Sequence, residues 1–162
     1  MDALRITVGM AHTEIIYTKD QGPVLIEMNG RWHLTNFGPL VDRCVGYNAV
    51  DAMVDVYTDP AAFEALPSEP ERLRESGRVV HLVSYVSGKL KRIHHMEQIS
   101  ALESVQDIHF FPKFVVGEDI PATVDISTDA GYVHLIHSDP DVVESDYQTI
   151  VDLMPTMLEV EA

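Results

Sequence analysis

Cysteine and basic side chains are both scarce in this chain of 162 residues. The single cysteine, Cys44, excludes an internal disulfide framework and predicts a reducing, cytoplasmic location. It lies in an apolar-periodic segment, so we expect a small core residue there. Lys and Arg number 11 against 26 Asp and Glu, a net charge of −15. A surface for nucleic acid or for an anionic membrane needs clustered basic residues, so neither partner is expected.

Long apolar runs and several common functional motifs are absent as well. No stretch approaches the roughly 18 apolar residues of a membrane span, and the N-terminus lacks the pattern of a secretory signal. GxGxxG and GxSxG do not occur, and Ser87-Gly88-Lys89 lacks the upstream glycine of a phosphate-binding loop. The eight histidines form no HExxH motif and no Cys/His pairing, which argues against zinc.

Apolar residues nevertheless make up 46% of the chain, enough for a folded core. The pattern of apolar and turn residues predicts three parts. Residues 1–66 should form a hairpin followed by helices, and residues 67–77, which are charged and hold two prolines, should form a linker. Residues 78–162 should form a β-rich subdomain that is closed by a helix. The predicted fold class is therefore α+β.

Local signals place the elements within these parts. In the first part we expect a hairpin over 11–29, helices over 39–44 and 49–57, and a helical turn over 59–63. In the last part we expect two hairpins, 78–85 with 89–95 and 120–127 with 131–137, a short helix over 97–102 and a strand over 105–111. Asn48 is expected to cap the helix over 49–57. The closing helix has the clearest start signal, Asp139 as N-cap followed by Pro140.

The most informative feature is a pair of glutamates in the first hairpin. If Asp20-Gln21 forms a two-residue loop, opposed residues have numbers that sum to 41, so Glu14 lies opposite Glu27. Because side chains alternate between the faces of a strand, Glu27, Asn29 and Arg31 project to one side. Two carboxylates, an amide and a guanidinium therefore share one small patch.

The electrostatics of this pair favour a bound cation. Directly opposed side chains have Cβ atoms about 5 Å apart. At that distance two carboxylates repel by roughly 3 kcal/mol at an effective dielectric near 20, and by under about 1 kcal/mol when fully solvated. Apolar residues on both faces predict a buried hairpin, where such a pair needs a cation or a shared proton. Oxygen ligands from Glu14, Glu27 and Asn29 suit Mg²⁺ or Mn²⁺. The alternative is an exposed edge hairpin whose glutamates face solvent.

Three further features of the sequence each allow more than one interpretation. His12 either orients a glutamate, contacts a phosphate, or packs at the start of the strand. Trp32 either shields a site from water or packs the loop. The basic cluster over Lys89–His95 is either a solvated hairpin or a clamp for a phosphate or an acidic partner.

The segments Gly9-Met10-Ala11-His12-Thr13-Glu14-Ile15 and Gly22–Arg31 resemble the C-terminal part of an ATP-grasp ligase of the carboxylate–amine or amino-acid ligase type. In that family a hairpin supplies two acidic residues and the asparagine of an ExN motif, which hold the Mg²⁺ ions that bridge the ATP phosphates. The resemblance implies that Glu14, Glu27 and Asn29 are metal ligands and that Arg31 is a catalytic arginine. It implies a metal-binding hairpin with helices, then an antiparallel β-rich lobe closed by a C-terminal helix.

The same resemblance implies a function and a set of partners. The expected function is ATP-dependent joining of a carboxylate to an amine through an acyl phosphate, with ATP and Mg²⁺ or Mn²⁺ as cofactors. The family's ATP-binding lobe lies upstream of the hairpin, so we expect that a separate chain or self-association supplies it, or that this chain is a truncated product of a longer gene. The chain alone is not expected to be active. A non-catalytic remnant that acts as a binding or assembly module is the alternative. Residues Trp32–Asn36 stand where the family often has a glycine pair after the arginine, so the resemblance does not indicate which substrate is bound.

Overall fold

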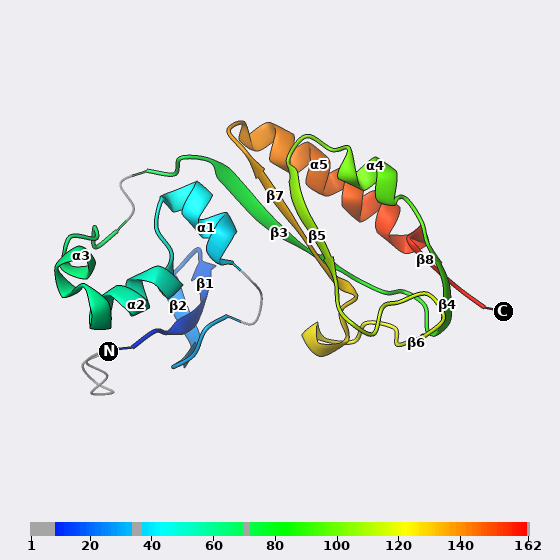
Figure 1. Cartoon of the computed structure of the whole chain (residues 1–162), viewed down its shortest axis with the longest axis horizontal. Helices are drawn as coiled ribbons and strands as arrows, with labels where there is room; N and C mark the ends of the chain where they lie inside the picture. Colours follow the sequence, from blue (N-terminus) through cyan, green and yellow to red (C-terminus); the bar gives the residue numbers. More distant parts are fainter. Residues whose placement is uncertain (1–8, 34–36, 70–71, 162) are drawn as a thin grey trace. The chain divides into compact units, whose positions relative to one another are not determined.

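Two compact units make up the part of the chain that the structure, a computed structural model, describes: residues 9–33, 37–69 and 72–161 (Figure 1). The division between the units falls between the described residues 69 and 72. The elements of the first unit are β1 (His12–Thr18), β2 (Gly22–Asn29), α1 (Gly38–Val45), α2 (Ala49–Thr58) and α3 (Pro60–Glu64). None of the described helices is long and apolar enough to cross a membrane.

The first unit opens with the antiparallel hairpin of β1 and β2. Thr18 pairs with Gly22, so the turn has three residues and the predicted two-residue loop is wrong. Gly22 has a φ of 69°, the left-handed conformation that commonly ends a three-residue turn. Near the turn, the pairing of the strands is therefore displaced by one residue from the prediction.

A bulge in β2 cancels this displacement farther along the hairpin. Ile15 pairs with Leu25, whereas the preceding residue Glu14 pairs with Glu27. Ile26 is the extra residue that lies between the two pairs in β2, as in a β-bulge. The predicted pairing of Glu14 with Glu27 is confirmed, although the predicted turn is not.

Capping residues set the limits of the helices in the first unit. Asn48 caps α2 as predicted, because its Oδ1 accepts hydrogen bonds from the backbone N–H groups of Val50 (2.8 Å) and Asp51 (3.0 Å). Gly46, with a φ of 96°, ends α1 in the left-handed conformation. Cys44 of α1 is buried, so its predicted core position is confirmed.

The second unit is built from short antiparallel strands and helices. Its elements are β3 (Ser76–Leu82), β4 (Gly88–Ile93), α4 (Met96–Ser100), β5 (Val105–Phe110), β6 (Asp119–Ile120), β7 (Gly131–His137), α5 (Pro140–Leu153) and β8 (Leu158–Val160). The strands form two three-stranded sheets, in the orders β3-β7-β5 and β6-β4-β8. The predicted α+β class and antiparallel β-rich lobe are therefore confirmed.

Both hairpins predicted for this unit are wrong in their partners. β3 pairs with β7 rather than with β4, and β4 pairs with β6 and β8. Residues expected to form a strand before β7 instead include a 3₁₀ turn at Ile126–Thr128. The physical reason lies in β7, which is buried along nearly its whole length. A strand of this kind needs a neighbour on each edge, and β3 and β5 supply them.

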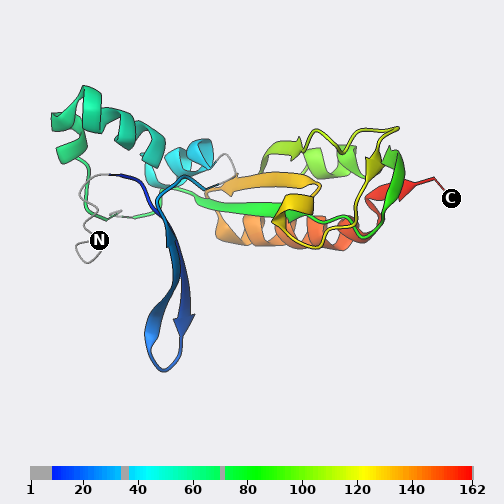
Figure 2. The same ribbon diagram turned by 90° about the horizontal axis from the view of Figure 1, so that it is seen from below.

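Helix α5 covers one face of the β3-β7-β5 sheet (Figure 2). It begins as predicted after Asp139, whose side chain accepts a hydrogen bond from the N–H of Asp141 (2.9 Å), with Pro140 in the first turn. The core between helix and sheet includes Val80, Leu82, Val133, Leu135, Val143 and Ile150. Asp146 of α5 is also buried, and its carboxylate accepts hydrogen bonds from the N–H (2.8 Å) and the hydroxyl (2.7 Å) of Ser104.

Candidate metal and substrate site

Four polar side chains share one face of the β1–β2 hairpin. His12 pairs with Asn29 and Glu14 pairs with Glu27 across the two strands. Alternation along each strand places His12 on the face of Glu14, and Glu27 on the face of Asn29. A hydrogen bond of 2.7 Å from Asn29 Nδ2 to Glu27 Oε1 agrees with this placement. We call these four residues the acidic patch.

The acidic patch lies at the surface of this chain. Glu14 and Glu27 are both exposed, and so are the apolar residues that follow or precede them, such as Ile15 and Ile26. The predicted burial of the hairpin is therefore wrong for the chain as it stands. β1 and β2 make their main contacts with each other rather than with the helices of their unit. Solvent consequently screens the repulsion between the two glutamates, and folding does not require a cation there.

The carboxylates of the acidic patch remain available to a cation. Among the residues that the structure describes, no Lys or Arg forms an ion pair with Glu14 or Glu27. Two carboxylates and the amide oxygen of Asn29 are oxygen ligands, which Mg²⁺ and Mn²⁺ prefer. No group of three His, Cys, Asp or Glu side chains is placed to hold a metal ion within the described ranges. A metal ion held here would complete its coordination with water or phosphate oxygens, as Mg²⁺ commonly does.

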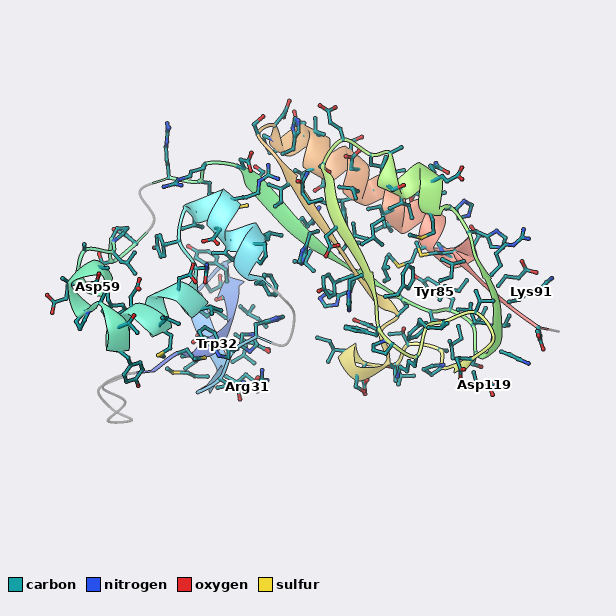
Figure 3. All side chains as sticks on the ribbon, viewed as in Figure 1. Arg31, Trp32, Asp59, Tyr85, Lys91 and Asp119 are labelled. Atoms are coloured by element: carbon teal, nitrogen blue, oxygen red, sulfur yellow. The ribbon has the colours of Figure 1, made fainter. Side chains whose placement is uncertain are left out.

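Arg31 lies beyond the strand that was expected to orient it. β2 ends at Asn29, so strand alternation does not extend to Arg31. Arg31 Nη1 donates a hydrogen bond to the carbonyl oxygen of Trp32 (3.0 Å), and Figure 3 labels both residues. Both residues also line a cavity whose wall includes one residue of the acidic patch, His12.

This cavity has a volume of about 590 Å³ and is formed within the first unit. We call it the Arg31 cavity. Its polar lining includes Arg31, His12, Thr13 and Asn48. Its apolar lining consists of Met10, Ala11, Trp32, Phe37, Gly38, Val41, Ala49 and Val50, and His33 completes the wall. One cationic group in a mostly apolar pocket is an arrangement that suits a small organic anion.

His12 belongs to both the acidic patch and the Arg31 cavity. Its ring packs edge-on against His33, with the ring centres 4.7 Å apart at an interplanar angle of 89°. Its Nδ1 is buried and has no hydrogen-bond partner among the residues that the structure describes. Leaving a buried polar atom unpaired costs about 1–3 kcal/mol. This cost makes His12 a position where a polar group of a ligand would stabilise the folded chain.

Sequence reasoning missed the helical side of the Arg31 cavity. From the sequence, Val41 and Val50 were interpreted as ordinary apolar positions of helices, and Asn48 was interpreted only as a helix cap. The turn at Gly46 brings the start of α2 close to α1, which places the cap in the cavity wall. The left-handed glycine directly before a capped helix was the signal that could have indicated this turn.

The basic cluster over Lys89–His95 lies on β4 and the residues after it, apart from the acidic patch in the chain. The ammonium of Lys91, labelled in Figure 3, and the ring of His94 (2.9 Å) both contact the carboxylate of Glu159 on β8. The hydrogen bond from Lys91, followed by that from His94, lowers the pKa of Glu159. Part of the positive charge of the cluster is therefore paired within the sheet, which weakens the interpretation as an anion clamp.

Several solved structures are similar to this chain in fold. The L-amino acid ligase from Bacillus licheniformis matches with a TM-score of 0.76 and 22% identity, over 99% of this chain and 38% of that protein. The phosphoribosylglycinamide synthetase from Anaerococcus prevotii matches with a TM-score of 0.65 and 15% identity, over 93% of this chain and 37% of that protein. The N5-carboxyaminoimidazole ribonucleotide synthetase from Thermotoga maritima matches with a TM-score of 0.63 and 18% identity, over 95% of this chain and 38% of that protein. All three are ATP-grasp ligases. This chain has part of an ATP-grasp fold.

The partial ATP-grasp fold confirms the resemblance that the residues of the hairpin indicated. The chain spans about 38% of the length of the ligases from Bacillus licheniformis and Thermotoga maritima. No protein-family model matches the sequence, and no curated protein matches it either. At these levels of identity the likeness establishes the fold, while the metal ligands Glu14, Glu27 and Asn29 and the role of Arg31 stay predictions.

Proposed function

We propose that this chain supplies the metal-binding and substrate-holding portion of an ATP-dependent carboxylate–amine ligase. The observation that carries the proposal is the pairing of Glu14 with Glu27, with Asn29 on the same face, in part of an ATP-grasp fold. In such a reaction a carboxylate oxygen of one substrate attacks the terminal phosphorus of ATP, the bond from that phosphorus to ADP breaks, and ADP leaves. The amine of the other substrate then attacks the acyl carbon, the bond from that carbon to the phosphate oxygen breaks, and an amide forms as phosphate leaves and the amine nitrogen loses a proton.

Each part of the site has a proposed task in this chemistry. Glu14, Glu27 and Asn29 hold Mg²⁺ or Mn²⁺, which offsets the negative charge of the transferring phosphoryl group when it is bound. Arg31 binds the carboxylate or the acyl phosphate, since a guanidinium matches the planar pair of oxygens. The apolar lining of the Arg31 cavity lowers the access of water, which would otherwise hydrolyse an acyl phosphate.

The substrates and partners follow from the same proposal. The substrates are a small carboxylate and a small amine that fit a cavity of about 590 Å³. ATP itself is held by a further lobe of the ligase, which belongs to the part of the matching ligases that this chain does not cover. The single cysteine supports a cytoplasmic location, which stays a prediction.

Titration with Mn²⁺ tests the proposed metal site. We expect Glu27→Gln to weaken Mn²⁺ binding by about tenfold or more, because it removes the charge of a direct ligand. Asp20→Asn is the matched control, since it removes one exposed carboxylate from the tip of the same hairpin. Electron paramagnetic resonance of free Mn²⁺ measures both affinities. Equal affinities for the two variants would contradict the assignment of Glu27.

A non-catalytic binding or assembly module is the second candidate function. The exposure of the acidic patch and the absence of a third acidic or imidazole ligand in position, among the described residues, favour this candidate. It predicts that the chain keeps its fold, as seen by circular dichroism, and binds no Mn²⁺. The same titration therefore decides between the two functions.

A further inference from the structure

We propose that the Arg31 cavity selects a carboxylate with a flat aromatic body, and that His33 is the residue that determines this selectivity. The inference rests on the proposed function and deepens it, because that function requires only a small carboxylate. The ligand class is an aryl carboxylate anion, which has a charged group at one end and an unsaturated ring at the other.

Three rings form a row on one side of the Arg31 cavity. The ring of His33 lies between those of His12 and Phe37, with ring centres 4.7 Å and 4.4 Å away and interplanar angles of 89° in both pairs. All three residues line the cavity, and we call them the aromatic wall. Edge-to-face contacts are an arrangement that aromatic rings prefer, and they add to the energy of apolar burial. A ligand ring can make the same kind of contact with this wall, whereas a saturated ring cannot.

The remaining apolar lining supports the same preference. Trp32 and Met10 line the cavity together with the aromatic wall (Figure 3 labels Trp32). The thioether of methionine makes favourable contacts with the edges of aromatic rings. An aromatic ring in the cavity would therefore have aromatic and sulfur groups as neighbours from several segments of the first unit.

The polar groups that remain available in the cavity suit a carboxylate. The amide of Asn48 is already occupied, since its nitrogen donates to Asp42 (2.9 Å) and Asp51 (2.8 Å) and its oxygen accepts from the backbone at the start of α2. Arg31 donates one hydrogen bond to the carbonyl oxygen of Trp32, and a guanidinium carries five N–H donors. Most of its donors can therefore bind the two oxygens of a carboxylate.

His12 and His33 have different tasks in this arrangement. The Nδ1 of His12 is buried and unpaired among the described residues, and in the tautomer that carries a proton there it donates to the same carboxylate. His33 contacts both other rings of the aromatic wall. A change at His33 should therefore alter the preference for a ring and leave the carboxylate donors in place.

Two probes of equal charge test this selectivity, phenylacetate and cyclohexylacetate. Each is titrated into the intact chain without metal or nucleotide, and nuclear magnetic resonance of the chain measures the two affinities. We expect phenylacetate to bind about fivefold more tightly, because ring contacts add to the burial of area. The saturated ring is the more apolar of the two, so a cavity that responds only to hydrophobicity would favour cyclohexylacetate.

Variants assign the preference to the ring at position 33. His33→Leu keeps an apolar side chain without a ring and should bring the two affinities together, whereas His33→Phe keeps a ring and should retain the preference. Tyr57→Leu is the matched control, since Tyr57 is an exposed aromatic residue of α2 that does not line the cavity. Arg31→Gln should weaken both probes by about tenfold or more, because the charged donor is lost.

The outcomes separate this inference from the proposed metal site. Equal affinities of the unchanged chain for the two probes would overturn the inference, and so would the absence of phenylacetate binding at millimolar concentration. Loss of the preference in both His33→Leu and His33→Phe would overturn it too, because the ring would then not be the cause. Glu27→Gln should lose Mn²⁺ binding and keep the preference, so either result can fail while the other remains readable.

Discussion

At the scale of single residues, His134 is one of the buried titratable groups of the second unit. It lies on the face of β7 away from α5 and is 5% exposed, and its Nε2 has no hydrogen-bond partner in the described part of the chain. Its ring packs against that of Tyr132, with ring centres 4.8 Å apart. Burial lowers the pKa of His134, the charge of Asp107 raises it, and His109 lowers it further. On the same face of β3, His81 pairs with Asp129 (2.8 Å).

The second unit should lose stability as the pH falls below about 6.5, the pKa of an unfolded histidine. Because the pKa of folded His134 is lower, the unfolded state binds more protons in this range. The free energy of unfolding therefore decreases from about pH 6.5 downward until the folded pKa is passed. We expect His134→Phe to flatten this dependence in urea unfolding followed by circular dichroism. His137→Phe, at the less buried end of the strand, is the control, and the same slope in both variants would contradict the prediction.

At the scale of elements, the start of β7 requires a glycine. A Cβ at position 131 would lie 1.9 Å from the backbone oxygen of His109 in the neighbouring strand β5. The contact joins β7, the central strand of the β3-β7-β5 sheet, to its neighbour β5. Even alanine therefore requires the strands to separate.

Gly131→Ala should destabilise the second unit by about 2 kcal/mol or more, because a well-packed pair of strands must shift to admit the methyl group. The free energy of urea unfolding measures this change. Gly30→Ala serves as the control, since a Cβ at Gly30 would meet no atom within 4 Å. Similar effects of the two substitutions would show that the close approach at Gly131 is not a constraint.

The elements that could be predicted from the sequence depend on neighbours in the chain. Asn48 and Asp139 identified the starts of α2 and α5, because a cap and its partners lie within a few residues of each other. The partners of β3 and β4 were wrong, because β7 and β8 lie far along the chain and are chosen by burial of the whole sheet. Turn signals between consecutive strands could not reveal that choice.

The candidate site was likewise predicted only in part from the sequence. The pairing of Glu14 with Glu27 was correct because two local errors cancelled: the turn has one residue more than expected, and the bulge at Ile26 compensates for it. Exposure of the hairpin was only the alternative to the predicted burial, since apolar residues alone do not show whether a cover belongs to the same chain. The Arg31 cavity was missed because its wall comes from four separate segments.

At the scale of the whole molecule, the chain combines one well-packed unit with one open hairpin. β7 is buried and paired on both edges, whereas β1 and β2 each have one partner and exposed side chains on both faces. Local stability in proteins varies with such differences in burial and hydrogen bonding.

Native-state hydrogen exchange should show this contrast directly. We expect the amide protons of β7 to exchange more slowly than those of β1 and β2 by about two orders of magnitude or more, because strands with few buried contacts open locally. Mass spectrometry of peptides from residues 12–29 and 131–137 measures both rates. Equal protection of the two segments would contradict the view that the hairpin has no cover of its own.

The bulge also affects how relatives of this chain should be searched for. Twelve residues separate Glu14 from Glu27, and one of them, Ile26, contributes nothing to the facing of the carboxylates. A chain without that residue would close the same tip and still oppose the same two acids. Homologues are therefore expected to vary by one in this spacing, and a search pattern of fixed length would discard some of them.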